Sequence, residues 1–207
     1  MNRPSRPKRS KNSGSSRHRK VRTGELRIIG GRWRGRRLPI TEAEGLRPTT
    51  DRTRETLFNW LAPHLAERRC LDLFAGTGAL GIEALSRGAH SCDFVETDTG
   101  AATRLRESLT TLDAGAQSRV HQADALAYLV SGAGPWDLVF IDPPFAGDLL
   151  ARTLAALDRA SLTNDALMYV ECAADEPAHE IDGWQCLREK TAGEVRYGLW
   201  ERGAGDV

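Results

Sequence analysis

Short apolar runs alternate with helical segments through most of this 207-residue chain, and this order restricts the possible fold more than any other feature. Runs of four to six mainly apolar residues are typical of strands that are buried on both faces. Their alternation with helices predicts an α/β fold, in which helices cover both faces of a parallel sheet. The expected strands are Cys70–Phe74, Ser91–Glu96, Arg119–Gln122, Leu138–Ile141 and Ala166–Glu171, and the expected helices are Leu80–Ser86, Ala101–Leu112, Ala125–Leu129 and Leu149–Leu157.

Two further strand pairs are expected outside this core, one toward each end of the chain. Glu25–Ile29 and Arg36–Ile40 surround a Gly-rich stretch, which predicts a β-hairpin. Asp51 is expected to cap a helix that follows this hairpin. Trp184–Lys190 and Glu194–Glu201 predict two antiparallel strands joined by a tight turn, so an antiparallel pair would close the sheet.

The net charge of +1 hides a strong asymmetry along the chain. Residues 1–54 hold 17 Lys and Arg against 4 Asp and Glu, whereas residues 55–207 hold 12 against 24. The first 22 residues carry nine positive charges and no acid, among Ser, Asn, Pro and Gly residues that cannot form a core. We therefore expect residues 1–22 to be a disordered basic arm. Such an arm attracts nucleic-acid phosphate or serves only as a solubilising tail.

Basic side chains also crowd the turn of the expected hairpin, beside a tryptophan. Arginine meets phosphate and an aromatic ring stacks on an unpaired base, a combination that suits RNA. The alternative for the tryptophan is that its ring packs inward as part of the core. The residues predicted to bind RNA are Arg32, Trp33, Arg34, Arg36 and Arg37.

Composition excludes several other classes of protein. A hydrophobic fraction of 40% can form a core, and no run of about 18 apolar residues is present to span a membrane. The basic N-terminus lacks the apolar stretch of a secretory signal, so we expect a cytoplasmic protein. Four widely spaced cysteines lack zinc-site spacing, which predicts no metal site and small core residues in a reducing compartment. They are Cys70, Cys92, Cys172 and Cys186.

A Gly-rich loop directly follows the first core strand. Gly76, Gly78 and Gly81 match G-x-G-x-x-G, and Glu96 ends the next strand, where an acid can accept both ribose hydroxyls of a nucleoside. NAD and S-adenosylmethionine both remain possible on this pattern. Asp72 favours S-adenosylmethionine, since a carboxylate would repel a pyrophosphate and attract an ammonium or sulfonium. The alternative is a structural carboxylate that binds loop amides.

Two later strand ends also carry acids. Asp124 could accept a hydrogen bond from an adenine amine or simply cap the next helix. Asp142, Pro143, Pro144 and Phe145 form a stiff loop at a strand's carboxyl end, where open α/β sheets bind ligands. The carboxylate and the Pro143 carbonyl can accept the two hydrogens of an exocyclic amine while the Phe145 ring stacks on the base. These four residues are therefore predicted to be catalytic, chiefly through positioning and electrostatics.

These motifs together resemble the class I S-adenosylmethionine-dependent methyltransferases, whose amino-methylating branch carries Asp/Asn-Pro-Pro-aromatic. More narrowly, the stretches from Arg27 to Gly35 and from Leu46 to Leu61 resemble the RsmD family, and the likeness extends to Glu201. The resemblance implies a Rossmann-like fold with a mostly parallel seven-stranded sheet. It also implies that Asp142, Pro143 and Phe145 hold a guanine. The cofactor would be lined by Asp72, Phe74, Gly76, Gly78, Glu96, Asp124 and Ala125.

The implied activity is methylation of guanine N2 at position 966, in conventional numbering, of 16S rRNA in the assembling small subunit. We expect a monomer made of the arm at 1–22 and a methyltransferase domain at 23–207, with a hairpin-and-helix part at 23–62 and a catalytic core at 69–202. One alternative is an adenine-N6 DNA methyltransferase, although the chain has no room for a separate target-recognition region. Others are an NAD-dependent oxidoreductase and a non-catalytic RNA-binding assembly factor.

Overall fold

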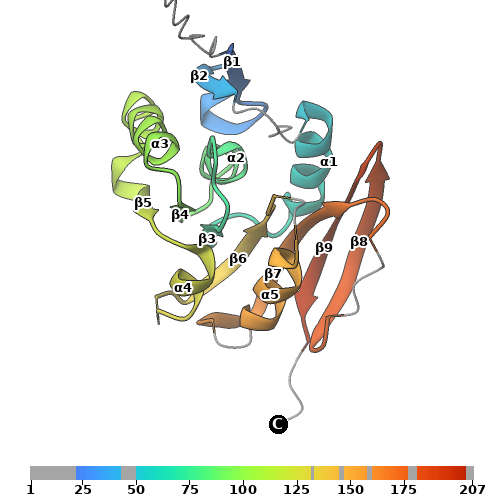
Figure 1. The fold of residues 1–207 in the computed structure, drawn as a ribbon. Coiled ribbons are helices and arrows are strands. Elements are labelled where there is room, and N and C mark those ends of the chain that lie inside the picture. Colours follow the sequence, from blue (N-terminus) through green and yellow to red (C-terminus); the bar gives the residue numbers. More distant parts are fainter. Residues whose placement is uncertain are drawn as a thin grey trace, which may run out of the picture.

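A seven-stranded sheet forms the centre of the molecule, in the order β5-β4-β3-β6-β7-β9-β8 (Figure 1). The computed structural model describes residues 22–42, 50–131, 133–144, 147–157, 160–176 and 181–203. The five strands β5, β4, β3, β6 and β7 pair in parallel, whereas β9 pairs antiparallel with both β7 and β8. The α/β fold with a closing antiparallel pair is thus confirmed. The strands are β3 (Arg69–Asp72), β4 (Ser91–Glu96), β5 (Ser118–Gln122), β6 (Trp136–Ile141), β7 (Leu162–Ala173), β8 (Trp184–Ala192) and β9 (Val195–Arg202).

Helices cover both faces of this sheet, as Figure 1 shows. Helices α1, α2 and α3 pack on one face through a core that includes Phe58, Leu105 and Phe140. Helices α4 and α5 pack on the other face, around Leu129 and Leu157. Burial of both faces explains the continuous apolar runs in the sequence. The helices are α1 (Asp51–Leu61), α2 (Ala79–Ser86), α3 (Thr99–Thr111), α4 (Ala125–Leu129) and α5 (Leu149–Leu157).

The direction of the chain across the sheet reverses between β3 and β6. From β3 the chain moves outward to β4 and β5, then returns to place β6 on the opposite side of β3. The crevice outside the carboxyl ends of two such strands is where open α/β sheets bind ligands. The loops that follow β3 and β6 are therefore where the fold predicts a ligand site.

The N-terminal hairpin consists of β1 (Arg22–Arg27) and β2 (Arg37–Glu42), which pair with each other in a separate sheet. The turn between them contains a short 3-10 helix and rests on α2 (Figure 1). At Gly31, where φ is 73°, an added Cβ would lie 1.8 Å from the Ser86 carbonyl oxygen. Ser86 Oγ also donates to the Gly30 carbonyl at 2.6 Å. Glycine is therefore required for this close approach.

Two local expectations are wrong. The cap of α1 is Thr50, whose side chain accepts from Thr53 N at 3.2 Å, and Asp51 is the first helical residue and bonds to Arg54 instead. Cys186 is exposed because β8 is an edge strand whose residues are mostly uncovered, whereas the other three cysteines are buried as expected. All four cysteines are free thiols. No helix in the described part of the chain is long and apolar enough to cross a bilayer.

Candidate functional site

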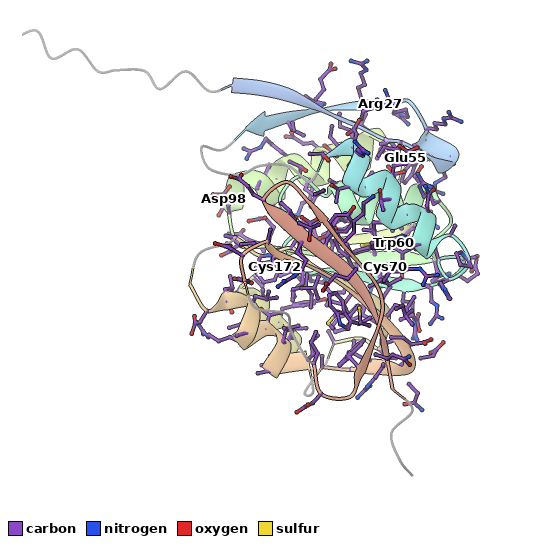
Figure 2. The ribbon with its side chains drawn as sticks, turned by 90° about the vertical axis from the view of Figure 1, so that its right-hand side faces the viewer. Arg27, Glu55, Trp60, Cys70, Asp98 and Cys172 are labelled. Atoms are coloured by element: carbon purple, nitrogen blue, oxygen red, sulfur yellow. The ribbon has the colours of Figure 1, made fainter. Side chains whose placement is uncertain are left out.

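Acidic side chains end three neighbouring parallel strands of the sheet. Asp72 is the last residue of β3, Glu96 is the last residue of β4, and Asp142 directly follows β6. Because adjacent parallel strands end at the same edge, these carboxylates gather at the point where the chain reverses. Figure 2 shows this edge: Asp98 and Cys172, near the ends of β4 and β7, lie toward one side and Cys70 toward the other.

The Gly-rich loop and the end of β4 are joined directly. Glu96 accepts from Gly76 N at 2.8 Å through one oxygen and from Asp98 N at 2.7 Å through the other. Gly76 and Gly78 have φ values of 51° and 76°, the left-handed region that favours glycine. An added Cβ on Gly76 would meet only the Phe74 carbonyl oxygen, at 4.0 Å. The loop thus presents backbone to a ligand beside the acid expected to take a ribose.

Asp72 lies behind this loop and is only 3% exposed. It accepts from Gly81 N at 3.0 Å, in the first turn of α2, which is the amide-binding role weighed from the sequence. Burial raises the pKa of Asp72 to about 7, the nearby Glu96 charge adds to the rise, and the Gly81 bond opposes it. A cationic ligand group would favour the ionised carboxylate. The site therefore fits a cofactor that carries an ammonium and a sulfonium; direct contact stays a prediction.

The adenine side of the predicted cofactor site lies at the end of β5. Asp124 is exposed and caps α4 by accepting from Ala127 N at 2.9 Å, so the capping alternative is what the structure contains. Ala125, the next residue, is buried, and Phe74 is half-buried against the α4–α5 core. Recognition of adenine by Asp124 stays a prediction.

The loop after β6 lies beside the Gly-rich loop. Leu73 N donates to the Phe140 carbonyl at 3.1 Å, which ties the exits of β3 and β6 together. Asp142 is half-buried, Pro143 is buried and Pro144 is exposed. Phe145 lies outside the described residues, as do residues 1–21 of the basic arm. The roles assigned to this loop stay predictions.

A carboxylate that the sequence analysis left without a role lies next to this loop. Glu171 is 3% exposed, and it accepts from the Tyr169 hydroxyl at 2.6 Å. Its neighbour Val170 pairs with Ile141, which places Glu171 beside Asp142 along the edge. Burial, with the charges of Glu171 and Asp142, raises the pKa of Tyr169 well above its usual range. The available signal was an acid at the end of a buried apolar strand, the same pattern that singled out Glu96.

The predicted RNA-binding residues divide into exposed and buried groups. Trp33 is only 7% exposed, and its backbone N donates to Ser86 Oγ at 3.0 Å. The prediction that its ring stacks on RNA is wrong, because the hairpin turn buries this large apolar side chain against α2. Arg32 lies over the outer side of that ring, with 4.0 Å from its guanidinium to the ring centroid. All four hairpin arginines are exposed: Arg32, Arg34, Arg36 and Arg37.

Three of these arginines also make contacts within the protein. Arg32 donates to Gln117 Oε1, and Arg36 donates to the Thr111 carbonyl at 2.7 Å, near the end of α3. Arg37 pairs with Glu25 at 2.8 Å. Within the described residues, no group of three or more His, Cys, Asp or Glu could hold a metal ion.

Comparisons with known proteins agree with this geometry. Residues 26–201 match the model of a family described as "Conserved hypothetical protein 95". The Ribosomal RNA small subunit methyltransferase D of Escherichia coli K12 is 47% identical over 88% of this chain and 92% of its own. The Haemophilus influenzae protein of the same name is 44% identical over 86% and 94%.

Two further comparisons are with a solved structure and with a more distant relative. The solved structure of yhhF from Escherichia coli has a TM-score of 0.81 and 48% identity, covering 87% of this chain and 99% of that one. A more distant relative, a tRNA1(Val) (adenine(37)-N6)-methyltransferase of Escherichia coli, is 30% identical over 55% of this chain and 48% of its own.

Proposed function

The chain belongs to the RsmD family, and on this basis we propose that it is an S-adenosylmethionine-dependent methyltransferase of 16S rRNA. The target is N2 of guanine 966, in conventional numbering, within the small subunit or an assembly intermediate of it. The observation that supports this most directly is the Asp142-Pro143-Pro144 loop, which lies at the chain reversal beside the Gly-rich loop. We further propose that the enzyme works as a monomer in the cytoplasm.

On this proposal the residues along the sheet edge divide the cofactor between them. Asp72 faces the methionine ammonium, Gly76 and Gly78 allow close approach of the backbone, and Glu96 takes the ribose hydroxyls. Asp124 and Ala125 lie toward the adenine, and Phe74 packs beneath the loop. When bound, S-adenosylmethionine supplies a methyl group made electrophilic by a sulfonium.

The loop after β6 would hold the target amine. Guanine N2 is a weak nucleophile because its lone pair is delocalised into the ring. Hydrogen bonds from its two hydrogens to Asp142 and to the Pro143 carbonyl favour a more tetrahedral nitrogen and aim the lone pair at the methyl carbon. Phe145 is proposed to stack on the ring, and Pro144 stiffens the loop. The base must leave its stack to reach this edge.

The hairpin arginines are proposed to bind rRNA phosphate, and the basic arm would extend this contact. Deletion of residues 1–22 is expected to weaken RNA binding and to flatten its dependence on salt. Binding titrations across a range of salt concentrations check this. A salt slope equal to that of the full chain would contradict a phosphate-binding arm.

The test of the proposed function is methyl transfer to small subunits from a strain that lacks this enzyme. Labelled S-adenosylmethionine should transfer one methyl per particle, located at guanine 966 by primer extension and identified as N2-methylguanine by mass spectrometry. Asp142→Ala should bind S-adenosylhomocysteine normally and lose about 10³-fold or more in kcat. Asp148→Ala, which removes an exposed acid shortly after the same loop, is the matched control.

The same assay separates the rivals. Label in double-stranded DNA but not in the subunit would support the adenine-N6 DNA methyltransferase instead. Calorimetric binding of NAD without binding of S-adenosylhomocysteine would support the oxidoreductase. Near-normal turnover by Asp142→Ala would overturn the site assignment.

A further inference from the structure

This inference rests on the proposed function and concerns how the site selects guanine. The Watson–Crick edge of guanine carries two adjacent donors, the N2 amine and N1–H, whereas N1 of adenine is an acceptor. Asp142 and the Pro143 carbonyl account for the amine. A base enclosed in the site would also bury N1–H, and a buried donor without an acceptor costs free energy. The site therefore needs a second acceptor next to Asp142.

Glu171 lies at the required place in the sheet. The Ile141–Val170 pair of the parallel β6–β7 ladder makes Asp142 and Glu171 neighbours where β6 ends, while β7 continues to Ala173 beside β9. Neighbouring strands lie about 4.8 Å apart, so acceptors at these two positions can reach two adjacent donors of one base. Glu171 is buried, with only 3% of its surface exposed.

The orientation of Glu171 is fixed by its own strand. Tyr169 lies two residues earlier on the same face of β7, and its hydroxyl donates to Glu171 Oε1 at 2.6 Å. The Tyr169 ring is held in turn by Phe140, with ring centroids 6.3 Å apart, and by Tyr197 at the same distance. Burial raises the pKa of the Tyr169 hydroxyl, and the charges of Glu171 and Asp142 add to the rise. A buried acid held this firmly is pre-organised to accept.

We propose that Glu171, held by Tyr169, is the residue that selects guanine, by accepting a hydrogen bond from N1–H of the target base. An adenine in the same position would turn its N1 lone pair toward the carboxylate and be repelled. The amine-holding loop alone does not make this distinction, since both bases carry an exocyclic amine. A relative named for adenine-N6 methylation matches 55% of this chain, so part of the same core occurs in a protein named for the other base.

The test uses 2-aminopurine, which keeps the exocyclic amine of guanine but has a bare acceptor nitrogen at N1. Small subunits are reconstituted with guanine, 2-aminopurine or adenine at the target position, and kcat and KM are measured for each. The unaltered protein should prefer guanine to 2-aminopurine by about 10²-fold or more in kcat/KM, because the analogue offers Glu171 an acceptor at N1 in place of the N1–H donor. Equal rates on guanine and 2-aminopurine would overturn the proposal without any variant.

Glu171→Gln then tests the residue itself. The amide can still accept but can also donate to a bare N1, so the preference for guanine over 2-aminopurine should fall at least tenfold, with less rejection of adenine. Tyr169→Phe removes only the hydroxyl and should lower the preference a few-fold. Glu201→Gln alters a half-buried acid on β9 opposite the amino-terminal part of β7, and it should change nothing.

The outcomes separate this inference from the function on which it rests. If the unaltered protein leaves guanine N2 unmethylated, the proposed function fails and this inference fails with it. If it methylates guanine but Glu171→Gln slows guanine and 2-aminopurine equally, Glu171 only supports the fold and this inference alone is overturned. Affinity for S-adenosylhomocysteine should be unchanged in both β7 variants.

Discussion

Helix α2 carries one buried carboxylate, Glu83, and contacts another, Asp72, and the two differ in their charged partners. Glu83, near its carboxyl end, is fully buried and accepts from Ile29 N at 2.8 Å, Gly30 N at 2.7 Å and Arg87 Nε at 2.7 Å. Asp72, facing its first turn, accepts from Gly81 N, and no cationic side chain in the described ranges forms an ion pair with it. The charge of Glu83 is thus neutralised by protein groups, whereas the charge of Asp72 is not.

This contrast distinguishes a buried charge that stabilises the fold, on Glu83, from one proposed to pair with a ligand, on Asp72. A buried charge is stable where protein groups surround it, and its partners then depend on it. A buried acid without a cationic partner loses stability by ionising, as the raised pKa of Asp72 indicates, and such acids cluster at binding sites. Glu83 therefore fixes the hairpin to the core, whereas Asp72 is proposed to pair with a cationic group of the cofactor.

The largest effect on stability is expected at Glu83, because several buried groups depend on its carboxylate. Glu83→Ala leaves the Ile29 and Gly30 amides and Arg87 Nε without their acceptor. It also removes the carboxylate that lies 3.7 Å from the guanidinium of Arg54, whose side chain is only 2% exposed. Loss of one member of a buried charge cluster costs about 3–5 kcal/mol, so the free energy of unfolding should fall by that amount. Denaturant titration measures it. Glu55→Ala, an exposed acid in α1 (Figure 2), is the control and should stay within about 0.5 kcal/mol. A small loss at Glu83 would mean that the hairpin and Arg54 do not depend on this carboxylate.

The second prediction concerns Asp72, whose replacement should not lower the free energy of unfolding as the loss of Glu83 does. Asp72→Asn keeps an oxygen for Gly81 N but removes the buried charge, so at pH 8 the free energy of unfolding should stay equal or rise. Affinity for S-adenosylhomocysteine, which retains the ammonium, should fall about 10–100-fold, since a charge-assisted bond is lost. Calorimetry checks the affinity. Asp93→Asn, on the opposite face of the neighbouring strand and bonded to His121 and Trp136, should leave it unchanged.

The third effect is a pH dependence that Asp72 alone should cause. Its pKa of about 7 in the folded protein exceeds the unfolded value of 3.8, so the folded state holds the proton more tightly. Stability from this group is therefore full below pH 4 and is lost as pH rises to about 7, by about 1.4 kcal/mol for each pH unit between those two pKa values. Cofactor binding needs the ionised form, so S-adenosylhomocysteine affinity should fall about tenfold from pH 8 to pH 6.

Differences between the unaltered protein and Asp72→Asn isolate this titration from all others. Denaturant midpoints and calorimetric affinities are compared at each pH for the two proteins. A flat difference between pH 5 and pH 8 in both quantities would mean that Asp72 stays ionised within the fold and is not reserved for a ligand.

The strand and helix pattern was predictable because it depends on local periodicity and on burial from both faces. Ser91–Glu96, Ala125–Leu129 and Leu149–Leu157 were predicted with their observed bounds, and Glu96 ends β4 as expected. These features follow from a rule of spacing along the chain. The strand-end acids then gather because parallel strands end at one edge.

The buried charge partners could not be predicted from spacing. Glu83 meets hairpin amides that lie 53 and 54 residues earlier, and only the docked hairpin brings them together. The prediction that Trp33 stacks on RNA was wrong for the same reason, since the turn that carries Trp33 packs against α2. Glu171 had a local signal, but its neighbour Asp142 comes from another strand. Residues whose role depends on a partner far along the chain need the fold to reveal it.

The smallest effect is expected on RNA affinity, where exposed hairpin arginines with and without an ion-pair partner are compared. Arg37 is already paired with Glu25 at 2.8 Å, whereas Arg34 forms no ion pair with any described residue. Removing Arg34 should therefore cost more RNA affinity than removing Arg37, a few-fold against less than twofold, and should reduce the salt slope by about one. Binding titrations with small subunits at several salt concentrations measure both, and S-adenosylhomocysteine affinity should stay constant. Equal slopes for Arg34→Ala and Arg37→Ala would show that internal pairing does not decide which charges are left for a ligand, because a partner 2.8 Å away would then have made no difference.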